Sequence, residues 1–202
     1  MTEVTDYSEI LSSICNEWDA AEDDIKVAEQ VGHQVVFPSI KELRYGGRRI
    51  IDALNAVAAG EPTEKITAFF EDARFNCYRA RHDAIDATIA IISVELHIKA
   101  KKIGYRAILK VYPEFSNLTR RLRATQEQIS QSRADRSNRE KIYSAVENAE
   151  FKDIVRMYRD FLDSEDIMRS MAQSDRFWRV MPIVVTSLIL LASIAFNVAH
   201  YL

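Results

Sequence analysis

The chain has 202 residues with only 5 glycines and 4 prolines, and its formal net charge of −3 conceals an acidic start and a basic stretch at residues 116–143. Abundant alanine, glutamate and arginine, with almost no alternation of apolar and polar residues, argue against a β-rich chain and predict an all-α fold. Cys15 and Cys77 have no metal-binding or redox spacing, which suits a reducing cytosol better than a disulfide framework.

Apolar residues recur at helical spacing through residues 1–175, which predicts an antiparallel cytosolic helical bundle. The first helix is expected from about Asp6 to Glu29, with its acidic residues on the face opposite the apolar one. No apolar signal sequence is expected before it, so the bundle should remain in the cytosol.

A second helix is expected after Pro38. Ser39 and Glu42 have the spacing of a capping box, which predicts that Ser39 opens this helix and that Gly60 ends it. Gly46 and Gly47 in its middle weaken a helix, so they predict close packing against a neighbour or a kink.

A third, very long helix is expected from Thr63 until Gly104, because no helix breaker lies between them. Its second half, residues 84–98, is apolar nearly all round and predicts a central, buried helix. Residues 116–147 are predicted to form a basic, polar helix or loop. Its arginine-rich part, residues 116–143, could bind nucleic acid or anionic lipid headgroups. Because this part lacks interleaved aromatic residues and contains acidic residues that dilute its charge, a solvated helical face is favoured.

A last helix of the bundle is expected from about Asn148, continuous with a C-terminal membrane anchor at residues 176–202. The run from Val180 to Leu202 contains no Lys, Arg, Asp or Glu. A helix needs about 20 apolar residues to cross a bilayer, so this run predicts a single-pass transmembrane helix. Pro182 is expected in its first turn, where a missing N–H does little harm.

Basic and aromatic residues just before the span predict an anchor at the membrane interface: Arg176, Trp178 and Arg179. By the positive-inside rule, they also predict a cytoplasmic N-terminus and a C-terminus on the far side.

Within the span, small and polar residues fall on one stripe: Thr186, Ser193, Asn197 and His200. Such a stripe is typical of membrane helices that associate, which predicts homo-oligomerisation, with a narrow polar path as one outcome. The alternative is that Asn197 and His200 meet water while Thr186 and Ser193 bond their own backbone. The sequence leaves both open.

The densest group of charged residues falls on the second and third helices: Arg44, Tyr45, Arg48, Arg49, Arg79, His82, Asp83 and Asp86. One interpretation is a polar pocket for a partner or a phosphate-bearing ligand, with His82 and a carboxylate available for acid–base work. The other is a network of ion pairs that fixes the register of the bundle. One pairing to test is Asp86 with an arginine of the second helix: if the two are paired inside the bundle, removing one partner should cost about 3–5 kcal/mol.

No catalytic motif accompanies these residues. A small helical ribonuclease of the HEPN type carries an arginine followed by a histidine with about four to six residues between them. Before His82, Arg74 is too distant for this spacing, and Arg79 and Arg81 are too near. The Glu-x-x-His pairs of di-iron bundles, a glycine-rich phosphate loop, and the H-E-x-x-H and C-x-x-C motifs are absent from the sequence. We therefore expect no metal, no cofactor and no catalysis.

Together these features predict a membrane-anchored interaction or effector protein that works as an oligomer. Its expected partners are the lipid bilayer, further copies of the chain, and a cytosolic protein or phosphate-bearing ligand, whereas nucleic acid is not expected. One alternative is a pore-forming or membrane-perturbing effector of the microbial defence or toxin type. A second is an enzyme with an unfamiliar site around Arg79, His82 and Asp83.

Overall fold

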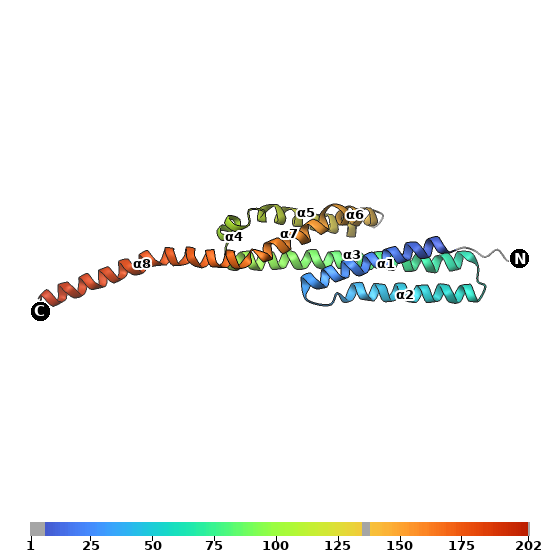
Figure 1. Ribbon diagram of the computed structural model, residues 1–202, viewed down its shortest axis with the longest axis horizontal. Helices are drawn as coiled ribbons and strands as arrows, with labels where there is room; N and C mark the ends of the chain where they lie inside the picture. Colours follow the sequence, from blue (N-terminus) through green and yellow to red (C-terminus); the bar gives the residue numbers. More distant parts are fainter. Residues whose placement is uncertain (1–6, 135–137, 202) are drawn as a thin grey trace. The chain divides into compact units, whose positions relative to one another are not determined.

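A computed structural model describes residues 7–134 and 138–201 (Figure 1). Within them the chain is almost wholly helical and contains no strand, which confirms the all-α bundle. The elements are α1 (Ser8–Gly32), α2 (Phe37–Ala58), α3 (Thr63–Ile103), α4 (Tyr105–Val111), α5 (Phe115–Ala134), α6 (Arg139–Val146), the π-helical segment η1 (Glu147–Phe151), α7 (Lys152–Asp163) and α8 (Glu165–Tyr201).

The chain divides into two compact units. The first unit comprises Met1–Glu95 and Thr119–Val155, and the second comprises Leu96–Leu118 and Arg156–Leu202. Long helices supply residues to both, since α3 enters the second unit at its C-terminal end.

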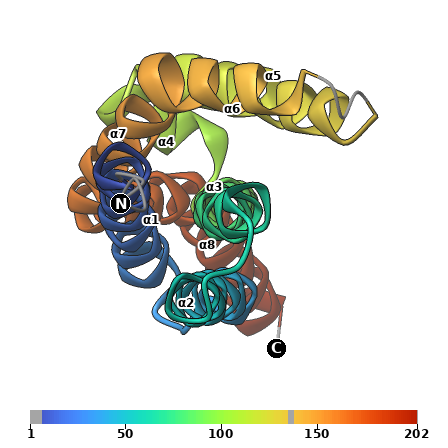
Figure 2. The same cartoon turned by 90° about the vertical axis from the view of Figure 1, so that its right-hand side faces the viewer.

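In the first unit, α1, α2 and the N-terminal part of α3 run antiparallel, and Figure 2 shows them nearly end-on. Their core combines small and branched side chains: Ala21, Ala28 and Ile25 of α1 pack with Ala80 and Ala84 of α3. Alanine at these positions lets the helix axes approach closely. Alongside them, α5 and α6 lie side by side (Figures 1 and 2).

The start of α2 differs from the predicted capping box. The helix begins at Phe37 with Val36 as its N-cap residue, and no side chain caps it. Pro38 fits the first turn because its missing N–H would have no helical partner there. Ser39 is fully buried and Glu42 is 5% exposed, so both face the packed interior and cannot cap the end.

Gly46 and Gly47 mark close helix packing, as one of the two interpretations predicted. A Cβ at Gly46 would lie 3.3 Å from the carbonyl oxygen of Ala73 in α3, and one at Gly47 would lie 3.6 Å from the Trp18 ring of α1. The helix continues through both glycines, so they serve the contacts of α2 on two sides.

α3 is unbroken, as predicted, but its second half is buried on one face only. Ile85 and Ile92 are fully buried, whereas Val94 is 59% exposed. In the basic segment, one stripe of α5 that includes Thr125 and Ser132 is buried, whereas Arg123 on another side of the helix is exposed. Part of the predicted loop, residues 135–137, lies outside the described residues.

In the second unit, α4, α7 and the first part of α8 pack together around aromatic side chains. The Phe115 and Phe161 rings lie 5.5 Å apart, and the Tyr112 hydroxyl donates a hydrogen bond of 3.0 Å to the Met157 carbonyl. Lys99 at the end of α3 donates a 2.6 Å hydrogen bond to Glu165 at the start of α8. These contacts fix the base of the long C-terminal helix.

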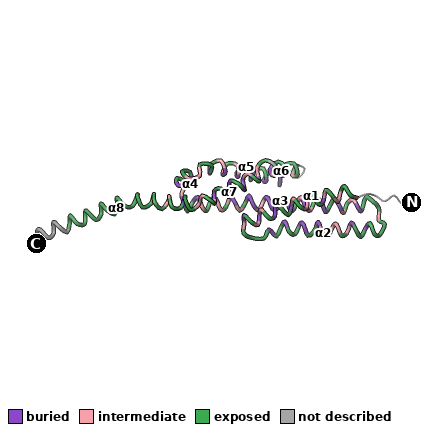
Figure 3. The backbone as a smooth tube through the Cα atoms, viewed as in Figure 1, coloured by how far each residue is buried: buried purple, intermediate pink, exposed green. Residues whose placement is uncertain are grey.

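α8 is nearly continuous with α7, with a single-residue interruption at Ser164, whose hydroxyl donates to the Asp160 carbonyl at 2.9 Å. Pro182 lies well inside α8, so the prediction that it occupies the first turn of the helix is wrong. The helix starts earlier because residues from Glu165 onward pack against the end of α3 within the second unit and continue the helical path of α7. An 18-residue window in Glu165–Ile194 has mean hydropathy 1.9 and no buried residue, so α8 is long and apolar enough to cross a membrane (Figure 3).

Candidate functional site

A largely enclosed charged group in the first unit is centred on Arg81 of α3. Arg81 Nη1 donates to Glu17 Oε2 of α1 at 2.6 Å, and Arg81 also pairs with Glu147, the first residue of η1. Its Nε lies 3.6 Å from Asp24 Oδ2, too far for a hydrogen bond but within ion-pair range. The side chains of Arg81 and Asp24 are 11% and 9% exposed. We call these four residues the Arg81 cluster.

The Arg81 cluster contains three carboxylates against one guanidinium, and this imbalance affects its protonation. Burial raises the pKa of Asp24 to about 6, and the nearby Glu147 carboxylate adds to the effect while Arg81 opposes it. Burial alone would lower the pKa of Arg81, but its hydrogen bonds to Glu147 and Glu17 raise it. Asp24 is therefore the group in the cluster that gains a proton in mildly acidic solution.

One residue further along α3, His82 packs flat against Tyr143 of α6. The two ring centroids lie 3.7 Å apart and the ring planes differ by 12°. Burial lowers the pKa of His82 to about 3, and the positive charges of Arg81 and Arg139 act in the same direction. The imidazole is therefore neutral at physiological pH and cannot act there as a protonated general acid.

Tyr143 also links this ring pair to Asp86. Its hydroxyl donates to Asp86 Oδ1 at 2.6 Å, and Arg133 of α5 donates to Asp86 Oδ2 at 2.8 Å. Burial raises the pKa of Tyr143, and its hydrogen bond to Asp86 raises it further. The prediction that Asp86 pairs with an arginine of the second helix is wrong, because α5 and α6 fold back onto this face of α3 and supply the partners.

A second arginine, Arg121 of α5, holds the other end of η1. It donates to Glu150 at 2.7 Å, to Asp153 at 3.2 Å and to the Ala149 carbonyl at 3.3 Å. π-Helical turns are uncommon and are often found at functional sites, since they insert a residue into the helical ladder. Here the turn brings Glu147 to Arg81 and Glu150 to Arg121, so it is fixed to both α3 and α5.

The arginines of α2 are occupied mainly by neighbouring carboxylates. Arg48 and Arg49 reach Asp52 at 3.1 and 3.2 Å, and Arg49 also lies 3.5 Å from Asp72 of α3. Arg44 lies over the Tyr45 ring, 5.5 Å from its centroid. None of these contacts leads to His82, so the eight residues predicted as one site do not converge.

The third helix is likewise split between different partners. Arg79 pairs with Glu42 of α2 at 3.0 Å, whereas His82 and Asp86 contact α6. Asp83 lies between the two groups. Burial raises its pKa, and the carboxylates of Glu42 and Asp86 add to the shift.

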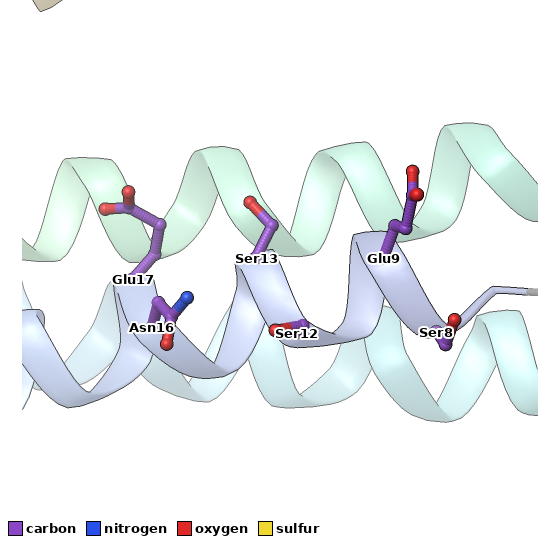
Figure 4. A pocket seen from close by; sticks show the side chains of 6 residues that line it. All are labelled: Ser8, Glu9, Ser12, Ser13, Asn16 and Glu17. Atoms are coloured by element: carbon purple, nitrogen blue, oxygen red, sulfur yellow. The ribbon is translucent and has the colours of Figure 1, made fainter.

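Two hollows lie on the first unit. A cavity of about 190 Å³ adjoins the Asp86–Arg133 pair and is lined by Asp86, Ile89, Ala90, Gln126, Ile129, Ser130 and Arg133. A shallow groove of about 580 Å³ runs along α1 between short polar side chains, which Figure 4 shows in a row along one helix. The groove contains Glu17 at one end but no arginine or histidine, so it offers no convergent chemistry.

The outward face of α2 carries apolar side chains that nothing in the described chain covers. Phe37, Ile40, Ile51 and Leu54 are exposed, and Phe37 reaches 75%. They recur at the spacing of one helical stripe, beside the exposed Arg44. We call Phe37, Ile40, Ile51 and Leu54 the α2 stripe.

The predicted polar stripe of α8 is described only in part. Thr186 Oγ1 donates to the Pro182 carbonyl at 2.7 Å, as expected if it bonds its own backbone. The side chains of Asn197 and His200 lie outside the described residues. Among the predicted interface residues, Trp178 is 69% exposed, and Arg176 donates to the Lys102 carbonyl at 3.3 Å.

Among the described side chains, no three His, Cys, Asp or Glu residues are grouped so that they could hold a metal ion.

The described part of the chain is a helical-bundle protein with one candidate membrane span, α8. Comparisons with protein-family models, with curated proteins and with solved structures found no match for the chain.

Proposed function

We propose that this protein is a membrane-anchored interaction protein that works as an oligomer and without catalysis of its own. The observation that carries the proposal is the apolar part of α8, none of which is buried by the rest of the chain as far as Ile194, where the description of its side chains ends. Isolated patches of exposed apolar residues are ordinary, but a continuous apolar helix this long requires lipid or other protein around it.

The charges near the span support an N-in orientation. Arg176 and Arg179 precede the apolar run directly, and the run itself contains no charge. Lys101 and Lys102 at the end of α3 add exposed positive charge next to α8, since Arg176 contacts the Lys102 carbonyl. Positive charge gathers on the cytoplasmic side of membrane helices, so the part of the chain that precedes the span would lie in the cytosol.

The α2 stripe is the surface we assign to a protein partner. Large apolar side chains at helical spacing are the anchors with which helices bind grooves or other helices. Arg44, beside them, would add charge complementarity toward an acidic partner. The sequence predicted a binding surface on both the second and the third helix. We assign it to the outward face of α2 alone.

The internal pairing of the charged residues supports a structural role for them. His82 is neutral and stacked on Tyr143, Arg79 is paired with Glu42, and Asp86 is held by two partners. An enzyme centred on Arg79, His82 and Asp83 would first have to break these contacts. In the predicted polar stripe of α8, the hydroxyl hydrogen of Thr186 is already used in a bond to the Pro182 carbonyl, so this residue would offer a pore only acceptor lone pairs.

Membrane anchoring is tested by expressing the full chain in bacterial cells and extracting the membranes with alkaline carbonate. We expect the chain to stay in the pellet and an N-terminal tag to remain accessible from the cytosolic side. Release into the supernatant would overturn the anchor.

Assembly is tested by the mass of the detergent-solubilised full chain, measured by light scattering. We expect an oligomer that is weakened in the variant Ser193→Leu/Asn197→Leu. A wild-type monomer would overturn the oligomer, while an oligomer unchanged in this variant would move the contact away from the α8 stripe.

The assigned surface on α2 is tested with a photo-crosslinking amino acid at Ile51. The matched control carries the same amino acid at Phe75 of α3, which is 59% exposed against 51% for Ile51. We expect a crosslinked protein at position 51 and none at position 75. Equal labelling at both positions would show that the α2 stripe has no special affinity.

A further inference from the structure

The short helix α4 has two different faces. Ala107 and Ile108 are buried, whereas Tyr105 and Leu109 are 58% and 42% exposed. Tyr105 and Leu109 stand one turn apart, and the exposed Arg106 and Lys110 repeat the same spacing beside them. The outward face of α4 is therefore apolar and basic at once.

The end of α3 extends this basic character. Lys101 and Lys102 are exposed, and no Asp or Glu occurs from Leu96 to Tyr112. We call Lys101, Lys102, Tyr105, Arg106, Leu109 and Lys110 the α4 surface.

Two contacts tie the α4 surface to α8 just before its apolar run. Arg176 donates to the Lys102 carbonyl at 3.3 Å, and Arg106 lies 3.9 Å from the carboxylate of Asp175. Val180 is the fourth residue after Arg176, which corresponds to about 6 Å along a helix. The polar headgroup layer on each side of a bilayer is roughly 5–8 Å thick. If α8 spans the membrane, the α4 surface lies at the depth of the headgroups.

We infer that the α4 surface binds the headgroups of anionic lipids, with its lysines and arginine at the phosphates and Tyr105 and Leu109 at the border of the acyl chains. This inference rests on the membrane anchor proposed above. Basic residues next to a membrane helix attract anionic lipid, and tyrosine is enriched at this interface because its ring has an apolar body and a polar tip. The α4 surface supplies both kinds of residue, at a depth where lipid is the adjacent phase.

The size of the effect follows from the charges. Each Lys or Arg near an anionic membrane surface contributes about 1 kcal/mol, which is roughly a fivefold change in affinity for that surface. Asp175 neutralises part of the charge of Arg106, but the side chain of Arg106 remains 79% exposed. Lys101, Lys102 and Lys110 are exposed as well.

The test uses the full chain in lipid nanodiscs and follows amide hydrogen exchange in residues 104–112. One set of nanodiscs contains phosphatidylcholine alone, and the other contains roughly 30% phosphatidylserine in addition, which supplies the negative surface potential. We expect exchange in α4 to slow by about fivefold or more in the anionic nanodiscs, and this protection to vanish near 1 M salt.

The decisive variant removes the four positive charges: Lys101→Gln/Lys102→Gln/Arg106→Gln/Lys110→Gln. The matched control removes four others in the first unit: Lys65→Gln/Arg74→Gln/Arg123→Gln/Lys141→Gln. We expect the α4 variant to lose the protection and the control to keep it. Exchange in residues 84–92 of α3 is the check that both variants remain folded.

Equal exchange of α4 in the two lipid compositions would overturn the inference, as would protection that survives in the α4 variant. A further outcome uses polyglutamate added to phosphatidylcholine nanodiscs. If it slowed exchange in α4 as much as phosphatidylserine does, the surface would be assigned to an acidic protein and the lipid inference would be overturned. Failure of the chain to enter nanodiscs at all would instead remove the membrane anchor, and with it the reason for placing α4 at the headgroups. Integration without lipid-dependent protection would leave the anchor intact and reject the α4 surface alone.

Discussion

The two longest helices of the chain, α3 and α8, have similar lengths of 41 and 37 residues but opposite relations to their surroundings. α3 carries charges along much of its length, yet Ile85 and Ile92 on it are fully buried by protein. The apolar half of α8 carries no charge, yet Leu190 and Leu191 are each 62% exposed. Polarity alone does not decide which helix is covered by the fold.

The two helices differ in the medium around their side chains, which is protein for α3 and, in our proposal, lipid for the apolar half of α8. α3 packs against other helices, so its charged side chains Arg81 and Asp86 need protein partners, which Glu17 of α1 and Arg133 of α5 supply. A buried charge without such a partner is expensive, which makes the pairing obligatory. The apolar half of α8 carries no charged side chain that demands such a partner, and lipid is the medium that suits it.

The strongest test of this view of α3 is Arg81→Met. Removing the guanidinium leaves the carboxylates of Glu17, Asp24 and Glu147 without their shared partner. Loss of one member of a buried ion pair costs about 3–5 kcal/mol, so we expect a loss of this size in the free energy of unfolding. Chemical denaturation of the detergent-solubilised chain measures it.

The control for Arg81→Met is Arg48→Met, which breaks a pair with Asp52 whose arginine is 70% exposed. Exposed pairs are worth about 0–1 kcal/mol, so the control should remain near wild type. Similar losses in the two variants would mean that burial does not set the value of the charges on α3.

The second test uses the pH dependence of stability at His82. Its pKa of about 3 in the folded chain lies below its ordinary value of 6.5. The unfolded chain therefore binds the proton first, so the contribution of the neutral imidazole to stability is complete above 6.5 and is lost as the pH falls toward 3. His82→Phe keeps a ring against Tyr143 and does not titrate.

As the pH is lowered from about 7.5 to about 4.5, the free energy of unfolding of His82→Phe should rise by roughly 3 kcal/mol relative to that of wild type. Each pH unit below the ordinary pKa of histidine corresponds to about 1.4 kcal/mol. The contribution of Asp24 to stability changes with pH in the opposite sense. Burial raises its pKa to about 6, so its charged form destabilises the fold at a pH above that value. The readout is therefore the difference between variant and wild type at each pH, in which the contribution of Asp24 cancels. A difference that does not change with pH would show that His82 is accessible to protons in the folded chain.

The third test addresses α8. Leu190→Asp places a charge near the middle of the apolar run, where an aspartate costs about 2.5–3.5 kcal/mol of membrane insertion. We expect a large part of the variant to be released by alkaline carbonate. Val94→Asp, on an exposed position of α3, makes the same change outside the run and should leave the extraction unchanged.

The helices of the fold could be predicted well from the sequence because their signals are local. The unbroken stretch from Thr63 to Gly104 predicts α3 nearly to the residue, and the glycine pair of α2 predicts its close contacts. The prediction that Ser39 opens α2 is wrong because a capping box and a buried helix face can have the same residue spacing. Ser39 and Glu42 satisfy both patterns, and the packing of α2 decided between them.

The candidate site could be predicted less well because its contacts are distant in the chain. The partners of Arg81 include Glu17 and Glu147, and those of Asp86 include Arg133 and Tyr143. One signal was present, since Glu17 and Asp24 follow Ile14 and Ala21 by three residues each and so lie next to the buried face of α1. Which arginine meets them depends on how the helices fold together, and no local pattern contains that information.

The smallest expected effect separates hydrogen bonding from charge at Asp86. Asp86→Ala leaves the hydroxyl of Tyr143, a residue only 4% exposed, without its acceptor. A buried polar group that loses its partner costs about 1–3 kcal/mol, and we expect the free energy of unfolding to fall by that amount.

Asp86→Asn retains an oxygen that can accept the same bond and loses only the charge opposite Arg133. Because the side chain of Arg133 is 67% exposed, that ion pair contributes at most about 1 kcal/mol. Thermal unfolding of the two variants should therefore rank Asp86→Asn close to wild type and Asp86→Ala clearly below it. The reverse order would mean that Arg133, and not Tyr143, is the partner for which α3 carries a carboxylate at this position.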